Sequence, residues 1–380
     1  MRRKESEKMK RFGIVSYNIY CNFTNYGSAL QSYALQQAAN AVGEGAWEAI
    51  VLDYCPDLLA DKNPLDPFKN MWDQDEESQR MCELTMPAIR ENYEKFNHFY
   101  ETRLKKSTHK YVSSNFNDVM EEEKLDGFIC GSDTIFCPDE FGFDDGYYAN
   151  YDCMKNSYSV AYAASFGDPH FTDETFPVLN ERLKNFKAFG LRENLMIPYV
   201  KEHTDVPVQK VIDPTLLLEY EDYDVLASDR LVEEKYLLIY SRRYNSKMED
   251  YAERMAKQNG WKIVEISLRA TNAEKGHIMF YQAGVEEFLS LVKHAEFVVT
   301  NSFHGIILSA QFRRQFVIFS REQCNTKIQE LLDLFGTSDR IMVNGDETIS
   351  EKIDYKSVHE RIGEARKESL AFLKQELAGC

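Results

Sequence analysis

The 380-residue sequence has no apolar run of about 18 residues, the length that a membrane-spanning helix needs. None of its eight cysteines forms a Cys-x-x-Cys pair, and no paired Cys/His spacing typical of zinc is present. No apolar export signal separates the basic residues 1–11 from the first expected strand. These absences predict a cytoplasmic protein with reduced thiols and no metal site. Peripheral association with a membrane stays open, and so does the oligomeric state.

Several nucleotide-binding and hydrolase signatures are missing too. The sequence contains no G-x-x-x-x-G-K-[ST] phosphate loop and no G-x-G-x-x-G dinucleotide fingerprint. It also contains no G-x-S-x-G nucleophile elbow and no H-E-x-x-H zinc helix. ATPases, dinucleotide-dependent oxidoreductases, serine hydrolases and metallohydrolases are therefore disfavoured.

Positive charge is scarce: 45 Lys and Arg against 62 Asp and Glu give a net charge of −17. Nucleic-acid binding needs a basic face, so this balance argues against a nucleic-acid partner. A small anionic substrate remains compatible, because a local group of arginines can oppose the overall sign. The apolar content of 43% and the length favour two or three domains with real cores rather than disorder.

Short apolar runs alternate with helical patterns, which predicts an α/β fold with two Rossmann-like, doubly wound domains. The expected strands of the first domain are Phe12–Tyr17, Glu48–Tyr54, Leu125–Gly131, Ser157–Ala164, Phe186–Leu191 and Val208–Ile212. Those of the second are Tyr236–Tyr240, Lys262–Ile266, Phe297–Thr300 and Phe316–Phe319. The expected helices of the second domain are Lys247–Gln258, Val285–His294, Ile306–Gln311 and Thr326–Leu334.

The polar stretch 219–234 places the domain boundary, giving an N-terminal domain of residues 1–220 and a C-terminal domain of 221–380. In the first domain, a helix is expected from Ala29 to Val42 with Ser28 as its N-cap, and residues 56–117 are expected to be a mainly helical insertion. Ser350–Leu377 predicts a C-terminal helical region. Two such domains leave a cleft between the carboxyl ends of their sheets.

The segment Thr300-Asn301-Ser302-Phe303-His304-Gly305 lies where an expected strand ends and a helix begins. The free backbone N–H groups and positive end of that helix would suit an anion. Ser302 can cap the helix or donate to a phosphate, Gly305 would let a ligand approach the backbone, and His304 suits acid/base chemistry near neutral pH. A capped helix with a histidine satisfied by the backbone is the alternative.

Three shorter segments are weaker candidates. Asp133, in Gly131-Ser132-Asp133, is a base, a sugar-hydroxyl ligand or an N-cap. Asn25-Tyr26-Gly27-Ser28 opens the first helix and would hold an acceptor or a phosphate, although glycine turns are common. Asp213-Pro214-Thr215 fits a turn as well as a site.

An anion site also needs fixed positive charge. Arg192 follows an expected strand, Arg242 and Arg243 follow the first strand of the second domain, and Arg269 ends the next. A guanidinium can hold a carboxylate or a phosphate through two parallel bonds, whereas surface salt bridges are the usual fate of an arginine. Arg192 and one of Arg242 and Arg243 are the favoured anion ligands.

These motifs together resemble the polysaccharide pyruvyl transferase family, in the family's order and over about Phe12 to Leu334. The matching segments are Asn25-Tyr26-Gly27-Ser28-Ala29-Leu30-Gln31, Gly131-Ser132-Asp133, Leu191-Arg192-Glu193, Asp213-Pro214-Thr215 and Thr300 to Gly305. Each is short, but five in order are fairly specific. Where the family often has Gly-Ser-Asp-Gln-x-Trp-Asn, this chain has Thr134-Ile135-Phe136-Cys137 after Asp133, which leaves the contacts of this loop and the acceptor open.

The resemblance implies a glycosyltransferase-B-like pair of domains that transfers a pyruvyl group from phosphoenolpyruvate to two hydroxyls of one sugar, as a ketal. The sugar would belong to a cell-surface polysaccharide or its precursor, and the acceptor would be nucleotide-bound, lipid-linked or polymeric. No cofactor or metal is required. The first domain would bind the acceptor and the second the donor.

The residue roles follow from that implied reaction. His304 would be the general acid, and Asp133 would orient or deprotonate the acceptor. The donor ligands would be Arg192, Arg242, Arg243, Asn301, Ser302, Phe303 and Gly305. The acceptor ligands would be Asn25, Gly27, Ser28, Ser132 and Asp213.

Two other functions fit the same architecture. A glycosyltransferase could bind the diphosphate of a nucleotide sugar at the helix that begins near Ser302. A non-catalytic glycan-binding relative would not need His304, Arg192 and Asp133 to lie together. The geometry of these three side chains therefore distinguishes the enzyme from the binding protein.

Overall fold

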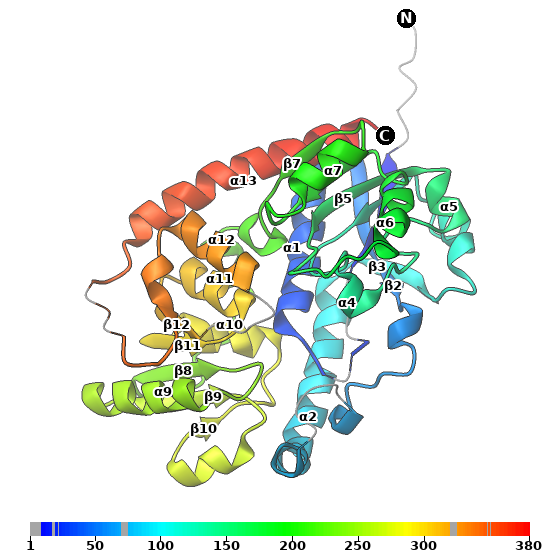
Figure 1. Ribbon diagram of the computed structural model, residues 1–380. Coiled ribbons are helices and arrows are strands. Elements are labelled where there is room, and N and C mark those ends of the chain that lie inside the picture. The colour runs from blue at the N-terminus through cyan, green and yellow to red at the C-terminus, as the bar shows by residue number, and fades with distance from the viewer. Residues whose placement is uncertain are drawn as a thin grey trace, which may run out of the picture.

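The structure is a computed structural model that describes residues 9–16, 20–21, 23–69, 75–319, 325–347, 349 and 351–380. Two parallel sheets with helices on both faces make up the fold (Figure 1). The predicted α/β class with two Rossmann-like domains is therefore confirmed. Over these residues no helix is both long and apolar enough to cross a bilayer.

The first sheet has seven strands in the order β3-β2-β1-β4-β5-β6-β7. Its apolar runs are buried on both faces, as in parallel sheets generally, and four consecutive residues of β1 are buried. The strands are β1 Lys10–Val15, β2 Trp47–Tyr54, β3 Lys106–Tyr111, β4 Gly127–Cys130, β5 Tyr158–Ala164, β6 Ala188–Leu191 and β7 Val208–Lys210.

The second sheet has six strands in the order β10-β9-β8-β11-β12-β13. Its strands are β8 Tyr236–Tyr240, β9 Lys262–Ile266, β10 Ile278–Met279, β11 Phe297–Thr300, β12 Gln315–Phe319 and β13 Ile341–Met342. The short edge strands β10 and β13 were not predicted from the sequence, because two residues are too few to show a hydrophobic period.

Helices cover both sheets (Figure 1). Those of the first half are α1 Tyr26–Gly43, α2 Glu76–Arg103, α3 Val119–Glu122, α4 Pro138–Phe141, α5 Asp152–Lys155, α6 Thr175–Leu183 and α7 Ile197–His203. Those of the second half are α8 Tyr220–Asp224, α9 Ser246–Asn259, α10 Val285–Lys293, α11 Phe303–Gln311, α12 Asn325–Phe335 and α13 Tyr355–Ala378. The expected domain boundary at 220/221 lies in α8, between β7 and β8.

Two sequence expectations for the first domain were wrong. Residues 56–117 are not only a helical insertion, because they also contain β3, the edge strand of the first sheet. The N-cap of α1 is Asn25 rather than Ser28, and its side-chain oxygen accepts from the backbone N–H groups of Gly27 and Ser28. The helix therefore starts one turn earlier than the apolar period indicates.

The two domains share one continuous hydrophobic core. Tyr26, in the first turn of α1, stacks on Phe288 of α10 at 4.2 Å between ring centroids and meets Tyr240 of β8 edge-on. Its hydroxyl donates to the carbonyl of Ala283 at 2.7 Å. Lys95 of α2 pairs with Glu287 of α10 at 2.8 Å. The domains therefore face each other in a fixed arrangement.

The C-terminal helix α13 belongs to the second half of the chain but packs on the first sheet. It runs across the top of Figure 1 toward the N-terminal domain, where the C-terminus lies. Phe372 contacts the ring of Tyr162, and the hydroxyl of Ser369 accepts from the backbone N–H of Ile212 at 3.0 Å. This helix therefore holds the two domains together opposite the helix pair α2 and α10.

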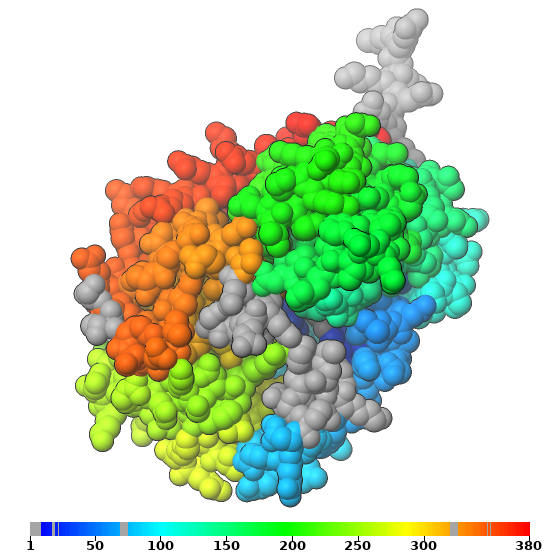
Figure 2. Space-filling model, in the orientation of Figure 1, coloured from blue at the N-terminus to red at the C-terminus, as the bar shows by residue number. Residues whose placement is uncertain are grey.

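A second contact between the domains lies on the face shown in Figure 2, where the green and orange surfaces meet. Glu330 of α12 accepts from the backbone N–H of Asn194 at 2.9 Å and from Lys210 at 2.5 Å. Asn194 follows β6, and Lys210 ends β7. The carboxylate of Glu330 thus ties α12 to two strand ends of the first sheet.

Candidate functional site

Two candidate side chains lie where the strand order of a sheet reverses. In the first sheet the reversal is between β1 and β4, and Asp133 follows β4. In the second sheet it is between β8 and β11, and His304 lies in the helix that follows β11. In open α/β sheets, ligands bind at the carboxyl ends of strands at such reversals. Arg192 and Asp213 reach the same region from the ends of β6 and β7.

Arg192, directly after β6, is buried among carboxylates. Its Nε donates to Glu193 at 2.8 Å and its Nη1 donates to Asp213 at 2.9 Å. Its Nη2 is buried without a hydrogen-bond partner among the described residues and lies 3.9 Å from Asp133. Arg192 was predicted to bind an anion, and Nη2 is the guanidinium nitrogen that the contacts within the protein leave for one.

Asp213 is the N-cap of the short helix η4 Pro214–Leu216 and is 2% exposed. Its Oδ1 accepts from the backbone N–H and hydroxyl of Thr215, at 3.0 and 2.6 Å. Burial alone would raise its pKa, but His304 and then Arg192 hold that pKa well below the usual value. Asp213 therefore belongs to the charged cluster, and its role as an acceptor ligand stays a prediction.

His304 lies at the meeting of the two domains. Its Nε2 is buried without a hydrogen-bond partner among the described residues and is 3.5 Å from Oδ2 of Asp213. A Cβ on Gly27 would lie 2.1 Å from the Nδ1 of His304. Because Gly27 has no side chain, the imidazole can pack against the first turn of α1. The contact with His304 therefore explains this glycine without an acceptor.

Asp133 faces the same space from the first sheet. It has a φ of 73°, accepts from the hydroxyl of Ser28 at 3.2 Å, and is 8% exposed. Burial would raise its pKa, but Arg192, followed by His304 and Lys327, outweighs burial and lowers that pKa. A carboxylate with a lowered pKa is a weak base, so orienting a hydroxyl suits Asp133 better than deprotonating it.

Phe303 and Lys327 complete the positive side of the site. The Arg192 guanidinium lies over the Phe303 ring at 4.8 Å, and the Lys327 ammonium is 6.0 Å from the same ring. Lys327 lies in α12, the helix that Glu330 ties to the first sheet. Sequence reasoning missed Lys327, because nothing in its local sequence distinguishes it from an exposed helical lysine.

The first turn of α11 points its backbone N–H groups at this cluster. Ser302 is the N-cap, as predicted, and its hydroxyl accepts from the N–H of Gly305 at 3.3 Å. The N–H groups of Phe303 and His304 lie outside the intrahelical ladder, which makes this helix end an anion site. The predicted role of Gly305 is corrected: a Cβ there would meet the Thr300 hydroxyl at 2.6 Å, so the glycine serves internal packing.

The loop after β8 is held by Asn301. Its side-chain oxygen accepts from the N–H of Arg242 and its amide donates to the carbonyl of Arg243, both at 2.8 Å. Arg242 reaches the first domain, where it stacks over Phe23 at 4.4 Å and donates to the carbonyl of Thr24 at 3.2 Å. Asn301 therefore shapes this loop, and the structure does not bring Arg242 into contact with His304 or Arg192.

Two further candidates for acceptor binding are used by the fold itself. The side chain of Asn25 caps α1. Ser132 is fully buried, its hydroxyl donates to the carbonyl of Ala163 at 3.0 Å, and its N–H donates to Gln31 at 3.0 Å. Both side chains have partners within the protein, and their contact with an acceptor stays a prediction.

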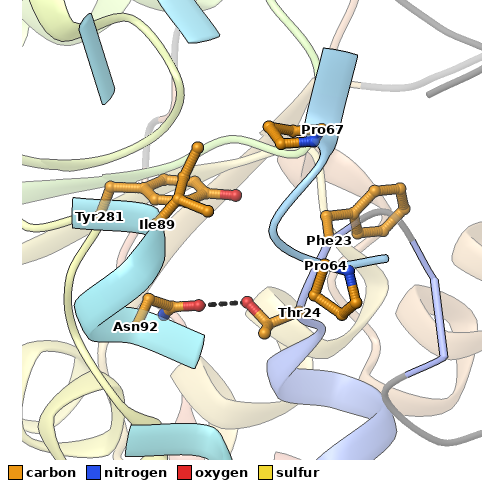
Figure 3. Close-up of a pocket in the computed structure, with 7 residues that line it drawn as sticks. All are labelled: Phe23, Thr24, Pro64, Pro67, Ile89, Asn92 and Tyr281. Carbon is orange, nitrogen blue, oxygen red and sulfur yellow. Dashed lines mark hydrogen bonds between the residues drawn. The ribbon is translucent and has the colours of Figure 1, made fainter. Parts of the chain in front are cut away.

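A narrow hollow lies beside the loop that precedes α1, between the two domains (Figure 3). Tyr281 and Ile89 close one side, and Phe23 faces them across the opening. Thr24 hydrogen-bonds Asn92 at its base. The remaining lining residues are Pro64 and Pro67. Sequence motifs did not indicate this hollow, because its residues come from four separate segments.

The described residues include no group of three or more His, Cys, Asp or Glu side chains arranged to hold a metal ion. The cluster contains the unpaired Nη2 of Arg192, the imidazole of His304, the N-terminus of α11 and the ammonium of Lys327. These groups lie near the carboxylate of Asp133. This combination can bind an anionic substrate, transfer a proton and orient a hydroxyl group.

The space at Gly27 gives a first prediction. Gly27→Ala is expected to lower the free energy of unfolding by about 1–3 kcal/mol, because the new methyl group must displace His304. Gly363→Ala is the matched control: Gly363 is also helical, but a Cβ there meets nothing within 4 Å. That variant should gain up to about 1 kcal/mol. Chemical denaturation measures the free energy of unfolding of both variants. Equal changes in the two variants would contradict the predicted contact between the new methyl group and His304.

The Arg192 cluster gives a second prediction. Arg192→Ala is expected to cost about 3–5 kcal/mol at neutral pH, because it leaves buried carboxylates unpaired. Arg192 lowers the pKa of Asp133 and Asp213 from 3.8, so its stabilisation is present above that value and lost as the pH falls. In Arg192→Ala, less positive charge opposes the effect of burial, so the two carboxyl groups protonate at a higher pH. The difference in the free energy of unfolding between this variant and the wild type should therefore shrink steadily as the pH falls.

The measurement is urea unfolding of both proteins at a series of pH values. Arg182→Ala is the control, since Arg182 pairs with Asp145, whose carboxylate is 44% exposed. An exposed pair contributes about 1 kcal/mol at most. A constant difference between Arg192→Ala and wild type at every pH would exclude the charge pairing as its cause.

Comparisons with known proteins agree with this geometry. The chain is similar to a putative UDP-N-acetylglucosamine 2-epimerase from Listeria monocytogenes, with a TM-score of 0.51 and 10% identity over 97% of this chain and 91% of that one. It is similar to the UDP-N-acetylglucosamine 2-epimerase from Rickettsia bellii, with a TM-score of 0.50 and 14% identity over 96% and 95%. At such identities the likeness shows the glycosyltransferase-B-like fold alone. No curated protein matches the chain.

The family comparison is more specific. The family described as "Polysaccharide pyruvyl transferase" matches residues 25–323, which is more than half of the chain. The match includes all five motifs, from Asn25 to Gly305, and ends before α12. The resemblance is therefore confirmed: the chain belongs to the polysaccharide pyruvyl transferase family of transferases.

Proposed function

We propose that the protein transfers a pyruvyl group from phosphoenolpyruvate to two hydroxyls of one sugar, forming a ketal and releasing phosphate. The observation that supports this most directly is the convergence of His304, Arg192 and Asp133, which are far apart in the sequence. A glycan-binding protein without activity would not need a buried imidazole and guanidinium with unpaired nitrogens. Family membership supports the same reaction class.

The donor has a carboxylate and a phosphate, so it needs two groups of hydrogen-bond donors. The N-terminal turn of α11, with its positive end, suits the phosphate. The Arg192 guanidinium, with its unpaired Nη2, and the ammonium of Lys327 both lie within about 6 Å of the centre of the Phe303 ring. Since Arg242 is turned toward Phe23, it is a weaker candidate for donor binding than the sequence indicated.

His304 is the proposed general acid. It protonates the methylene carbon of the donor while positive charge develops on the adjacent carbon, and the first sugar hydroxyl attacks that carbon. The second hydroxyl then displaces phosphate, and its proton leaves with the phosphate. One hydroxyl proton thus replaces the proton spent on the methyl group, and the balance needs no oxidant or metal.

The acceptor approaches from the first domain. Asp133 accepts from the Ser28 hydroxyl and can orient a sugar hydroxyl. A cytoplasmic precursor of a cell-surface polysaccharide is the acceptor class we propose.

The general acid gives a prediction for the reaction. His304→Gln is expected to lower acceptor-dependent phosphate release from phosphoenolpyruvate by about 10² to 10⁴-fold, because the proton donor is lost. His98→Gln is the control, since His98 is exposed on α2. Circular dichroism checks that both variants fold. Full activity of the His304 variant would exclude this residue as the acid.

The identity of the donor substrate can be tested before the acceptor is known. Phosphoenolpyruvate at about 100 times its dissociation constant should stabilise the protein by about 2.7 kcal/mol, seen as a raised melting temperature. Uridine diphosphate at the same concentration is the comparison ligand. Stabilisation by the nucleotide and not by phosphoenolpyruvate would contradict the proposal and favour a nucleotide-sugar glycosyltransferase.

A further inference from the structure

Asp213 is fixed more firmly than a turn-opening residue needs to be. Its Oδ1 is taken by the backbone N–H and hydroxyl of Thr215. Its Oδ2 accepts from Nη1 of Arg192 at 2.9 Å and lies 3.5 Å from Nε2 of His304. The carboxylate therefore has one defined orientation, with Oδ2 between a guanidinium and an imidazole.

The two nitrogens of His304 have different surroundings. Nε2 is buried, and Asp213 is the acidic group beside it. Nδ1 lies on the other side of the ring and packs against Gly27, where a side chain would collide with it. When a carboxylate holds one N–H of an imidazole, the other nitrogen is the one that exchanges protons with a substrate.

Charged groups of both signs surround the ring of His304. Asp213 comes from η4, Asp133 follows β4, and Arg192 with Glu193 follows β6. Lys327 comes from α12, and the first turn of α1 has no acidic residue. The cluster therefore has three carboxylates and two cations besides the imidazole.

We propose that Asp213 is the positioning residue of the general acid: it holds the Nε2 side of His304 and stabilises the imidazolium, so that Nδ1 delivers the proton. This inference rests on the proposed function for the identity of the proton acceptor. In the step, the Nδ1–H bond breaks and its electron pair stays on nitrogen. The new C–H bond forms from the double bond of phosphoenolpyruvate, and the proton of the attacking hydroxyl returns to Nδ1.

The lowered pKa of Asp213 agrees with this role, because after burial, which raises it, His304 is the first of the groups that lower it. A different explanation is that Asp213 matters only through Arg192. Glu193 separates the two explanations, since it also bonds Arg192, at 2.8 Å, and no contact between Glu193 and His304 is present among the described residues. Asp213→Asn and Glu193→Gln each remove one carboxylate from the guanidinium, but only the first removes the partner of His304.

The test is an NMR titration of the full-length protein with ¹⁵N-labelled histidine, in which His304→Gln identifies the His304 signals. Neutral His304 is expected to keep its proton on Nε2. Asp213→Asn should move the midpoint of the His304 titration to lower pH by about one unit or more, because the imidazolium loses its ion partner. Glu193→Gln should move it less.

An unchanged midpoint in Asp213→Asn, an equal shift in Glu193→Gln, or a neutral form protonated on Nδ1 would overturn the inference. If Asp213→Asn does not fold, Thr215→Val serves instead, since it keeps the charge but removes a bond to Oδ1. It should shift the midpoint in the same direction by less, and no shift would again overturn the inference.

The rate of acceptor-dependent phosphate release adds a second readout. The alkaline limb of the kcat profile should move to lower pH in Asp213→Asn, whereas Glu193→Gln should lower kcat with little movement of that limb. The titration needs no substrate, so absence of phosphoenolpyruvate-dependent activity in the wild type would refute the proposed function and leave the Asp213–His304 interaction to be decided by NMR.

Discussion

The site depends on one buried cation. The Arg192 guanidinium gives Nε to Glu193 and Nη1 to Asp213, and stacks on Phe303 of the second domain. It therefore joins the ends of β6 and η4 in the first domain to the first turn of α11. Removing the guanidinium would leave the buried carboxylates of Glu193 and Asp213 unpaired, which costs several kcal/mol. The positions of Asp213 and His304 follow from this constraint.

The continuous core between the domains is what makes such a constraint possible. Tyr26 packs on Phe288, and α13 returns to cover the first sheet. Ligand sites between Rossmann-like domains often sit in mobile clefts, but here Glu330 also ties α12 to the first sheet. Gly27 and His304 can be in contact only because the two helix ends are held at a fixed separation.

Sequence reasoning predicted much of the fold, because buried parallel strands appear as apolar runs with a polar or glycine-rich end. It predicted Ser302 as an N-cap, because the hydroxyl stands directly before the apolar period of α11. The same rule failed at Ser28, where Asn25 caps the helix one turn earlier. It missed β3, because the alternating polar residues of this exposed edge strand do not resemble a buried run.

The sequence by itself determined the α/β class, the two-domain division and the set of segments that end at strand edges, since these depend on local periodicity. Only the tertiary structure decided which side chains meet. Asp213 became a partner of His304, Ser132 turned inward, and Lys327 joined the site, because contacts between residues far apart in the sequence depend on how the sheets are stacked. The sequence does not show which partner a charged side chain has, because burial and geometry in the folded protein determine that partner.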